Sequence, residues 1–165
     1  MKNYIKYNGG SLWTCESGQI NAHPVLLCNG GPGCCDYLRA LLYIAGNGIQ
    51  NDRNWNEEYH RNLDERGERL PDMDYPFNTA VNMAGNRTLR EFGRAPDFYL
   101  RVSRMDMPAL FVMAENDIRP SWPAEQLASL MPCAKIVRVK NASHFIWLDN
   151  PKELQKVLSE FISQL

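Results

Sequence analysis

The sequence has no apolar run long enough to span a bilayer, and its first residues lack the apolar core of a signal peptide. It also lacks an excess of either charge: Lys and Arg number 18, Asp and Glu number 19, and the net charge is −1. No basic face is implied, which argues against a nucleic-acid partner. We therefore expect a cytoplasmic protein that binds neither a membrane nor nucleic acid.

Cysteine is scarce, and the spacing of the cysteines matches no zinc-binding pattern. The five cysteines, an odd number, are Cys15, Cys28, Cys34, Cys35 and Cys133. We expect thiols that stay reduced, no metal and no cofactor.

The sequence also lacks the Gly-x-Ser-x-Gly turn that presents a nucleophilic serine between a strand and a helix. None of its eight serines is predicted on a glycine-flanked turn of that kind. A hydrolase that depends on such a serine is therefore missing its nucleophile in this chain.

The 165 residues suit one domain with a moderate core, and 44% of them are hydrophobic. Short apolar runs alternate with helical patterns, which predicts a mostly parallel sheet of the α/β class. The expected elements are a β-hairpin over residues 4–15, strands over 24–28, 41–45, 109–113 and 135–139, and helices over 122–131 and 151–165. Ser121 is expected to cap the first of these helices, with Pro123 in its first turn, and the stretch from Asn150 to Glu153 resembles a capping box at the start of the second. The apolar residues of the second helix are predicted to share one face: Leu154, Val157, Leu158, Phe161, Ile162 and Leu165.

The stretch from about residue 51 to residue 105 differs in pattern from the two ends of the chain. Trp55, Tyr59 and Leu63 recur at a spacing of four, and two further short helices are predicted on either side of Pro96. We interpret this stretch as a helical insertion into the α/β core.

An acid and a histidine follow two of the predicted strands. Asp117 comes four residues after the strand over 109–113, and His144 comes five residues after the strand over 135–139. Adjacent parallel strands would bring the two loops together, and a carboxylate that orients an imidazole is the base half of a hydrolytic triad. The alternative is a surface acid and a loop histidine that never meet.

A glycine-rich turn from Asn29 to Gly33 follows the strand over 24–28. Backbone N–H groups of such a turn can bind a developing oxyanion, with Gly30 and Gly31 as the donors. The alternative is a tight turn between a strand and a helix.

Three motifs together resemble one protein family. The turn from Asn29 to Gly33 is similar to the His-Gly-Gly-Pro-Gly signature of the proline iminopeptidase branch of the α/β-hydrolase superfamily. Residues 114–120 resemble the acid loop of that superfamily, and residues 141–145 resemble its histidine loop. The resemblance implies a reduced α/β-hydrolase core formed by residues 1–45 and 106–165, with residues 46–105 as a helical cap.

The family reaction would release an N-terminal residue, often proline, from a peptide through an acyl-serine intermediate. The resemblance gives His144 the role of general base, Asp117 that of its orienting carboxylate, and Gly30 and Gly31 that of oxyanion donors. Cap acids would hold the substrate amine, with Glu57, Glu58 and Glu65 as candidates, unless they only form a solvated helix face. Trp55, Tyr59 and Trp147 would line a pocket for a proline-like ring, unless they pack in the core.

Two departures from the family pattern affect these expectations. Asn29 stands where the family usually has histidine, and Leu38 runs directly into the strand over 41–45. The resemblance implies that the segment with two central strands and the nucleophilic serine is missing between them. A thiolate at Cys34 or Cys35 is a conceivable replacement for the serine nucleophile. The alternative is that both cysteines have a structural role. We expect a single copy to be close to inert.

A different class of function is a non-catalytic binding or interaction module. The loss of central strands would leave an exposed sheet edge, which predicts dimerisation or strand exchange. Two further alternatives remain. The chain could form an active complex with a full-length relative, or the missing segment could reflect a gene-level deletion without a selected function. If the chain is active, the partner is a peptide or a small amide or ester.

Overall fold

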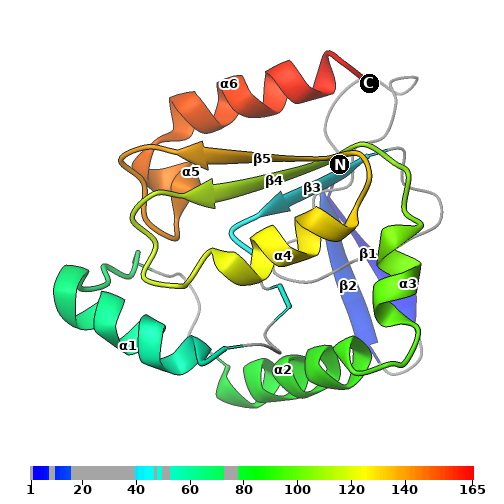
Figure 1. Ribbon diagram of the computed structural model, residues 1–165, viewed down its shortest axis with the longest axis horizontal. Helices are drawn as coiled ribbons and strands as arrows, with labels where there is room; N and C mark the ends of the chain where they lie inside the picture. Colours follow the sequence, from blue (N-terminus) through cyan, green and yellow to red (C-terminus); the bar gives the residue numbers. More distant parts are fainter. Residues whose placement is uncertain (1, 8–9, 16–39, 47, 50–52, 73–77) are drawn as a thin grey trace.

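The computed structural model describes residues 2–7, 10–15, 40–46, 48–49, 53–72 and 78–165 (Figure 1). The predicted strand over 24–28, the glycines Gly30 and Gly31, and the cysteines Cys34 and Cys35 lie outside these residues.

Strands and helices alternate along the second half of the chain, as the sequence predicts. In chain order the elements are β1 (Lys2–Tyr7), β2 (Gly10–Cys15), β3 (Leu41–Ile44), α1 (Trp55–Arg66), α2 (Thr79–Gly93), α3 (Phe98–Ser103), β4 (Ala109–Ala114), α4 (Trp122–Leu130), β5 (Ala134–Val139), α5 (Ile146–Asp149) and α6 (Pro151–Ile162). The short helix α5 was not predicted, because four residues give too little periodicity to detect.

The described strands form two sheets. β1 and β2 pair antiparallel, with Lys2 opposite Cys15 and Tyr7 opposite Gly10, which confirms the predicted N-terminal hairpin. β3, β4 and β5 form a parallel sheet with β4 in the centre. The chain therefore has the expected α/β class, with a small, mostly parallel sheet.

The central strand β4 explains why this sheet is stable. All six of its residues are buried, because helices cover both faces of the sheet. Leu110 and Val112 point to the face covered by α6, where they pack with Leu154 and Phe161. Phe111 and its neighbours at alternate positions point to the face covered by α3 and α4. Figure 1 shows α6 and α4 on opposite sides of the strands.

Helix α6 begins with the cap that its sequence predicts. The side chain of Asn150 accepts a hydrogen bond from the backbone N–H of Glu153, and Pro151 occupies the first turn. The predicted apolar face is buried at Leu154 and Phe161 but not at its end, since Ile162 is 43% exposed. The part of α6 that packs on the sheet is therefore shorter than the run of periodic apolar residues in its sequence.

Helix α4 begins differently from the prediction. Pro123 lies in its first turn, as expected, but the side chain of Ser121 does not cap the helix backbone. Its hydroxyl donates instead to a carboxylate oxygen of Glu125, at 3.0 Å. The hydroxyl of Ser121 is therefore bonded to a side chain of the first turn, and does not accept a backbone N–H as an N-cap would.

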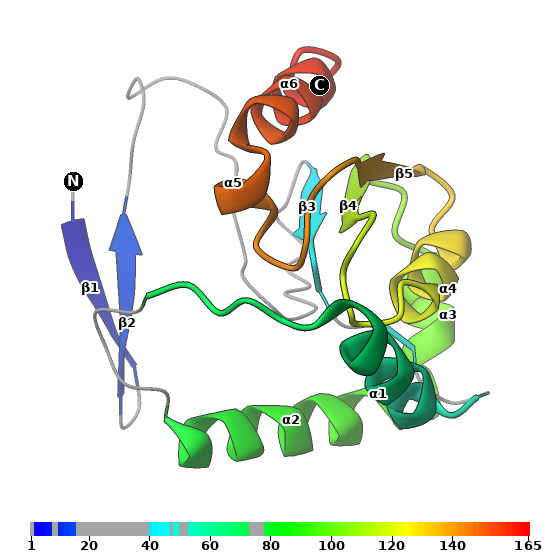
Figure 2. The ribbon, with the colours of Figure 1, turned by 90° about the vertical axis from the view of Figure 1, so that its left-hand side faces the viewer.

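The middle of the chain is helical, as predicted, with α1, α2 and α3 separated by non-helical residues. Figure 2 shows α1 and α2 on the side of the molecule opposite α6. α3 packs Phe98 and Val102 into the core cluster beneath α4, whereas α2 has no buried residue. The division into a core and a separate cap domain stays a prediction. No helix in the described ranges is both long and apolar enough to cross a membrane.

Candidate functional site

The loop after β4 carries Asp117, and neighbouring strands fix its path. The backbone N–H of Glu115 donates to the carbonyl oxygen of Val139 at 3.0 Å, and that of Asn116 donates to Ala142 at 2.9 Å. Since β4 and β5 run parallel, the loops that follow them lie at the same edge of the sheet. These bonds place the acid loop directly beside the loop that carries His144.

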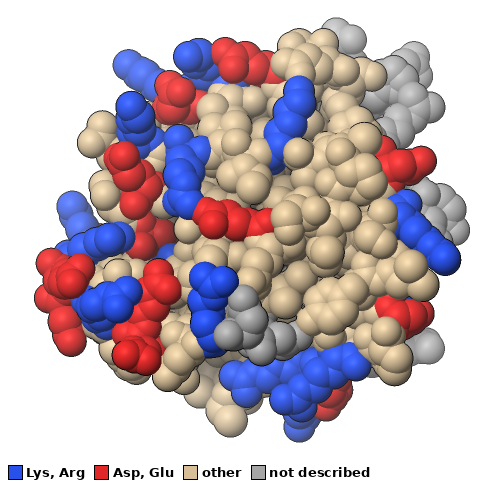
Figure 3. Space-filling view, viewed as in Figure 1, with Lys and Arg blue, Asp and Glu red and all other residues tan. Residues whose placement is uncertain are grey.

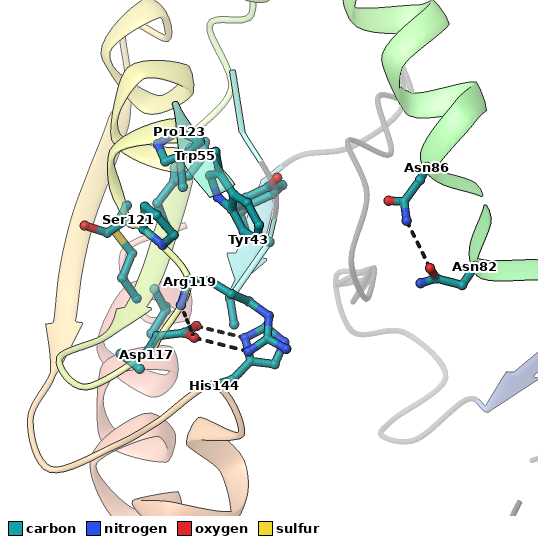
Figure 4. Close-up of a pocket in the computed structure, with 17 residues that line it drawn as sticks. Tyr43, Trp55, Asn82, Asn86, Asp117, Arg119, Ser121, Pro123 and His144 are labelled. Carbon is teal, nitrogen blue, oxygen red and sulfur yellow. Dashed lines mark hydrogen bonds and ion pairs between the residues drawn. The ribbon is translucent and has the colours of Figure 1, made fainter. Parts of the chain in front are cut away.

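The two side chains meet at this edge. Nδ1 of His144 lies 2.8 Å from Oδ2 of Asp117, although the residues are 27 positions apart (Figure 4). The side chain of His144 is 23% exposed and that of Asp117 is 13% exposed. The contact that strand order predicted is therefore present, in a partly desolvated setting.

The contact fixes the tautomer of the imidazole. An ionised carboxylate only accepts hydrogen bonds, so Nδ1 of His144 carries the proton and donates it to Asp117. In the neutral ring Nε2 is then the free base. In the described part of the chain no protein group bonds to Nε2. This arrangement is the one a general base requires.

Several groups act on the ionisation of Asp117. Burial raises its pKa, but the hydrogen bond from His144, the backbone N–H of Arg119 and the nearby positive charges oppose this effect. The net result is a pKa below the ordinary value for aspartate. The backbone N–H of Arg119 lies 2.9 Å from Oδ1, so the two carboxylate oxygens have separate donors. Asp117 is thus held as a carboxylate that orients His144.

Helix α1 and the residues after it hold the acid loop from the other side. The buried side-chain amide of Asn62 donates to the carbonyl oxygen of Ile118 at 3.1 Å, and Arg66 donates to the carbonyl oxygen of Asp117 at 3.2 Å. Arg119 forms an ion pair with Glu68 at 2.6 Å and lies 3.4 Å from Asp117. Sequence reasoning missed these supports, because no periodicity or motif marks a polar residue whose partner is about fifty positions away.

A cavity of about 290 Å³ opens beside the acid–base pair. His144 and Asp117 line it at one end, and Tyr43 and Trp55 line its apolar part (Figure 4). Its volume is close to the lower end of the range for small-molecule sites. The arrangement can hold a small substrate against Nε2 of His144.

Of the residues predicted to bind substrate, only Trp55 lines this cavity. Glu58 accepts a hydrogen bond from the indole N–H of Trp122 at 2.9 Å, and Glu57 lies exposed in the first turn of α1. Trp147 is 41% exposed and packs its ring against Phe145. The other predicted acid and aromatic, Glu65 and Tyr59, do not line the cavity either. The predicted oxyanion donors Gly30 and Gly31 lie outside the described residues.

No serine whose side chain the structure describes is hydrogen-bonded to His144. Ser121 lines the cavity, but its hydroxyl donates to Glu125 and accepts from Arg138. Cys133 precedes β5 and so lies at the amino end of the strand, away from the acid–base pair. The described residues therefore supply an imidazole and the carboxylate bonded to it, and none of the described serine and cysteine side chains lies within hydrogen-bond reach of that imidazole.

Comparison with known proteins shows which fold carries this pair of side chains. No family model matches the chain. Two solved structures align with it at TM-scores of 0.51 and 0.52: CarC, a serine hydrolase involved in carbazole degradation, and a membrane phospholipase A described as a bacterial virulence factor. The sequence identities are 17% and 18%, and the alignments cover 76% and 77% of this chain. The fold is a reduced α/β-hydrolase fold.

The chain spans only part of these proteins. It covers 54% of the CarC chain and 49% of the phospholipase chain. In sequence it is 25% identical over 88 residues to the Bacillus subtilis protein "Putative 2-succinyl-6-hydroxy-2,4-cyclohexadiene-1-carboxylate synthase", which is 53% of this chain and 32% of that protein. The shared architecture supports the hydrolase fold and does not single out the proline iminopeptidase branch.

Proposed function

We propose that Asp117 and His144 are the acid–base half of an acyl-transfer site, and that one copy of the chain does not complete turnover alone. The observation that supports this most directly is the 2.8 Å contact between His144 Nδ1 and Asp117 Oδ2 beside a cavity. A neutral imidazole oriented in this way accepts a proton at Nε2 from an attacking hydroxyl, thiol or water. Its substrates would be esters or amides.

The expected loss of turnover follows from the chemistry of a triad. The base only removes a proton; a nucleophile must form the bond to the acyl carbon, and oxyanion donors must stabilise the intermediate. With the nucleophile missing, only about 10³-fold acceleration over water remains from binding and the oxyanion site. Asp117 and His144 would then bind and polarise a substrate, but no acyl-enzyme would form.

The narrower specificity that we propose is the release of an N-terminal residue, often proline, from a peptide. It rests on the resemblance of residues 29–33 to the glycine-rich signature of proline iminopeptidases. The apolar surface of Tyr43 and Trp55 in the cavity suits a proline-like ring. An ester substrate is the main alternative within the same chemistry.

The test is an assay of the purified chain with prolyl para-nitroanilide and with para-nitrophenyl acetate. A serine-directed fluorophosphonate probe, followed by mass mapping, runs in parallel. We expect no turnover of the anilide above the His144→Ala variant, and no labelled residue. Turnover together with a label at one residue would identify a substitute nucleophile and overturn the proposed inactivity.

We propose a non-catalytic interaction module as the second candidate. Among the described strands β3 pairs on one side only, with β4, and an unpaired strand edge is a template for another chain. The partner would be a second copy of this chain or a full-length relative. Light scattering after size exclusion tests the first option: a dimer supports it, and a monomer at all concentrations contradicts it.

A further inference from the structure

A second cavity, of about 400 Å³, lies between the start of α1, the carboxyl end of α2 and the start of α3. We call it the arginine pocket. Its lining includes three basic side chains, Arg53, Arg90 and Arg94, and five aromatic ones, of which Trp55, Phe92 and Tyr99 are not buried. Its volume lies in the range of small-molecule binding sites. Neither the predicted acid–base chemistry nor the core makes use of this combination.

The charge of the arginine pocket is one-sided. Among the residues that the structure describes, no Asp or Glu lines it, although the whole chain has a net charge of only −1. Two nearby acids are engaged elsewhere: Asp97 pairs with Arg101 at 3.3 Å, and Glu58 accepts from Trp122. Figure 3 shows Lys and Arg side chains gathered over α2 at the lower edge of the view. The pocket is therefore a local positive site on a protein of balanced charge.

The two arginines from α2 are available to a ligand. Within the part of the chain that the structure describes, the guanidinium groups of Arg90 and Arg94 form no ion pair and no hydrogen bond. They are four residues apart, at the end of α2 and just after it, so they lie on the same side one turn apart. Each guanidinium group is a planar fork of N–H donors that matches a carboxylate, which accepts paired hydrogen bonds.

The aromatic lining adds a surface for an apolar body. Phe92 is 36% exposed and Tyr99 is 40% exposed, which is high for large rings that line a concave surface. Trp55 stacks on Tyr59 on one side, with ring centroids 4.9 Å apart, and lines the pocket as well. A planar ring or short apolar chain would cover these groups and gain free energy from their burial.

We infer that the arginine pocket binds a small aromatic carboxylic acid as its anion, with the carboxylate on Arg90 and Arg94 and the ring against the aromatic side chains. This inference goes beyond the acid–base pair and does not depend on it. Tyr43, Trp55 and Asn86 line both cavities, so the two sites adjoin.

Calorimetric titration of the full chain with trans-cinnamate tests the inference, with cinnamamide and acetate as comparison ligands. The amide keeps the ring and removes the charge, and acetate keeps the charge and removes the ring. We expect cinnamate to bind at one site, and both comparison ligands to bind about tenfold more weakly or not at all. Binding should weaken as salt is raised, because the site is open to solvent.

Variants of α2 locate the site. Replacement of both Arg90 and Arg94 by Gln should raise the dissociation constant for cinnamate by about tenfold or more, since each removes a charge-assisted bond. Arg87→Gln is the matched control, because Arg87 is an exposed arginine on the same helix that does not line the pocket. It should change the dissociation constant by less than about twofold.

Several outcomes would overturn the inference. They are equal binding of cinnamate and cinnamamide, equal weakening by Arg87→Gln, and no binding of cinnamate at millimolar concentration. The His144→Ala variant separates this inference from the proposed function, because it should bind cinnamate like the wild-type chain. Thermal unfolding of each variant confirms that the exposed arginines were replaced without loss of the fold.

Discussion

The side-chain amide of Asn62 in α1 donates a hydrogen bond to the backbone carbonyl oxygen of Ile118, 56 residues further along the chain. Asn62 is the one buried polar residue among the described side chains. Ile118 directly follows Asp117, so this bond ties a helix of the predicted cap to the loop that positions the acid. The position of Asp117 therefore depends on α1 as well as on the sheet.

Asn62→Ala should destabilise the protein, because the carbonyl of Ile118 would lose its buried donor. The expected loss in the free energy of unfolding is about 1–3 kcal/mol. Urea unfolding followed by circular dichroism measures it. Asn56→Ala, at an exposed position of the same helix, is the control and should stay within about 0.5 kcal/mol of wild type. Equal losses in the two variants would show that the amide bond contributes nothing.

The tautomer of His144 should depend on Asp117. Nitrogen NMR of the histidine rings should show the Nδ1-protonated form of His144 in the wild-type chain, because Asp117 accepts that proton. In Asp117→Ala the signal should move toward the mixed tautomers of a free imidazole. Asp64→Ala, at an exposed acid in α1, should leave it unchanged. An Nε2-protonated ring in the wild-type chain would exclude the proposed base.

The free energy of unfolding should fall at acidic pH, in part because Asp117 becomes protonated. Its pKa is lowered in the folded protein, so the unfolded chain binds a proton more readily. The contribution of the carboxylate is therefore complete above the ordinary aspartate pKa of about 3.9 and is lost as the pH falls below it. Urea unfolding should show a larger gap in the free energy of unfolding between wild type and Asp117→Asn at about pH 6 than at about pH 3. A gap that is constant over this range would contradict the lowered pKa.

Gly48 should not tolerate a side chain. A Cβ atom built on Gly48 would overlap the backbone of Pro123 at the start of α4, where Ile49 donates to the Pro123 carbonyl at 2.9 Å. Gly48→Ala should cost about 1–3 kcal/mol of stability as the two segments move apart. Gly85→Ala in α2 is the control, since nothing lies within 4 Å of its Cβ. It should stabilise the helix by about 1 kcal/mol, and thermal unfolding distinguishes the two outcomes.

Local patterns in the sequence determined most of the secondary structure. Apolar runs of strand length became β3, β4 and β5, and the Asn-Pro start with its periodic apolar positions became α6. These features depend on residues close together in the chain, which is why periodicity and capping residues predict them. The adjacency of Asp117 and His144 was one of two arrangements that the sequence left open, and it was favoured because neighbouring parallel strands bring their carboxyl ends to one edge.

The tertiary structure alone decided which other side chains hold the acid loop or line a cavity. Nothing local distinguishes Asn62 from Asn56, yet Asn62 is buried and donates to Ile118 whereas Asn56 is exposed. Nothing local distinguishes Arg90 and Arg94 from Arg87 either, yet the first two line a cavity and Arg87 does not. Such roles come from contacts between segments tens of residues apart. They are fixed only when the α/β core and the helices of the middle segment pack together, and no periodicity within either segment encodes them.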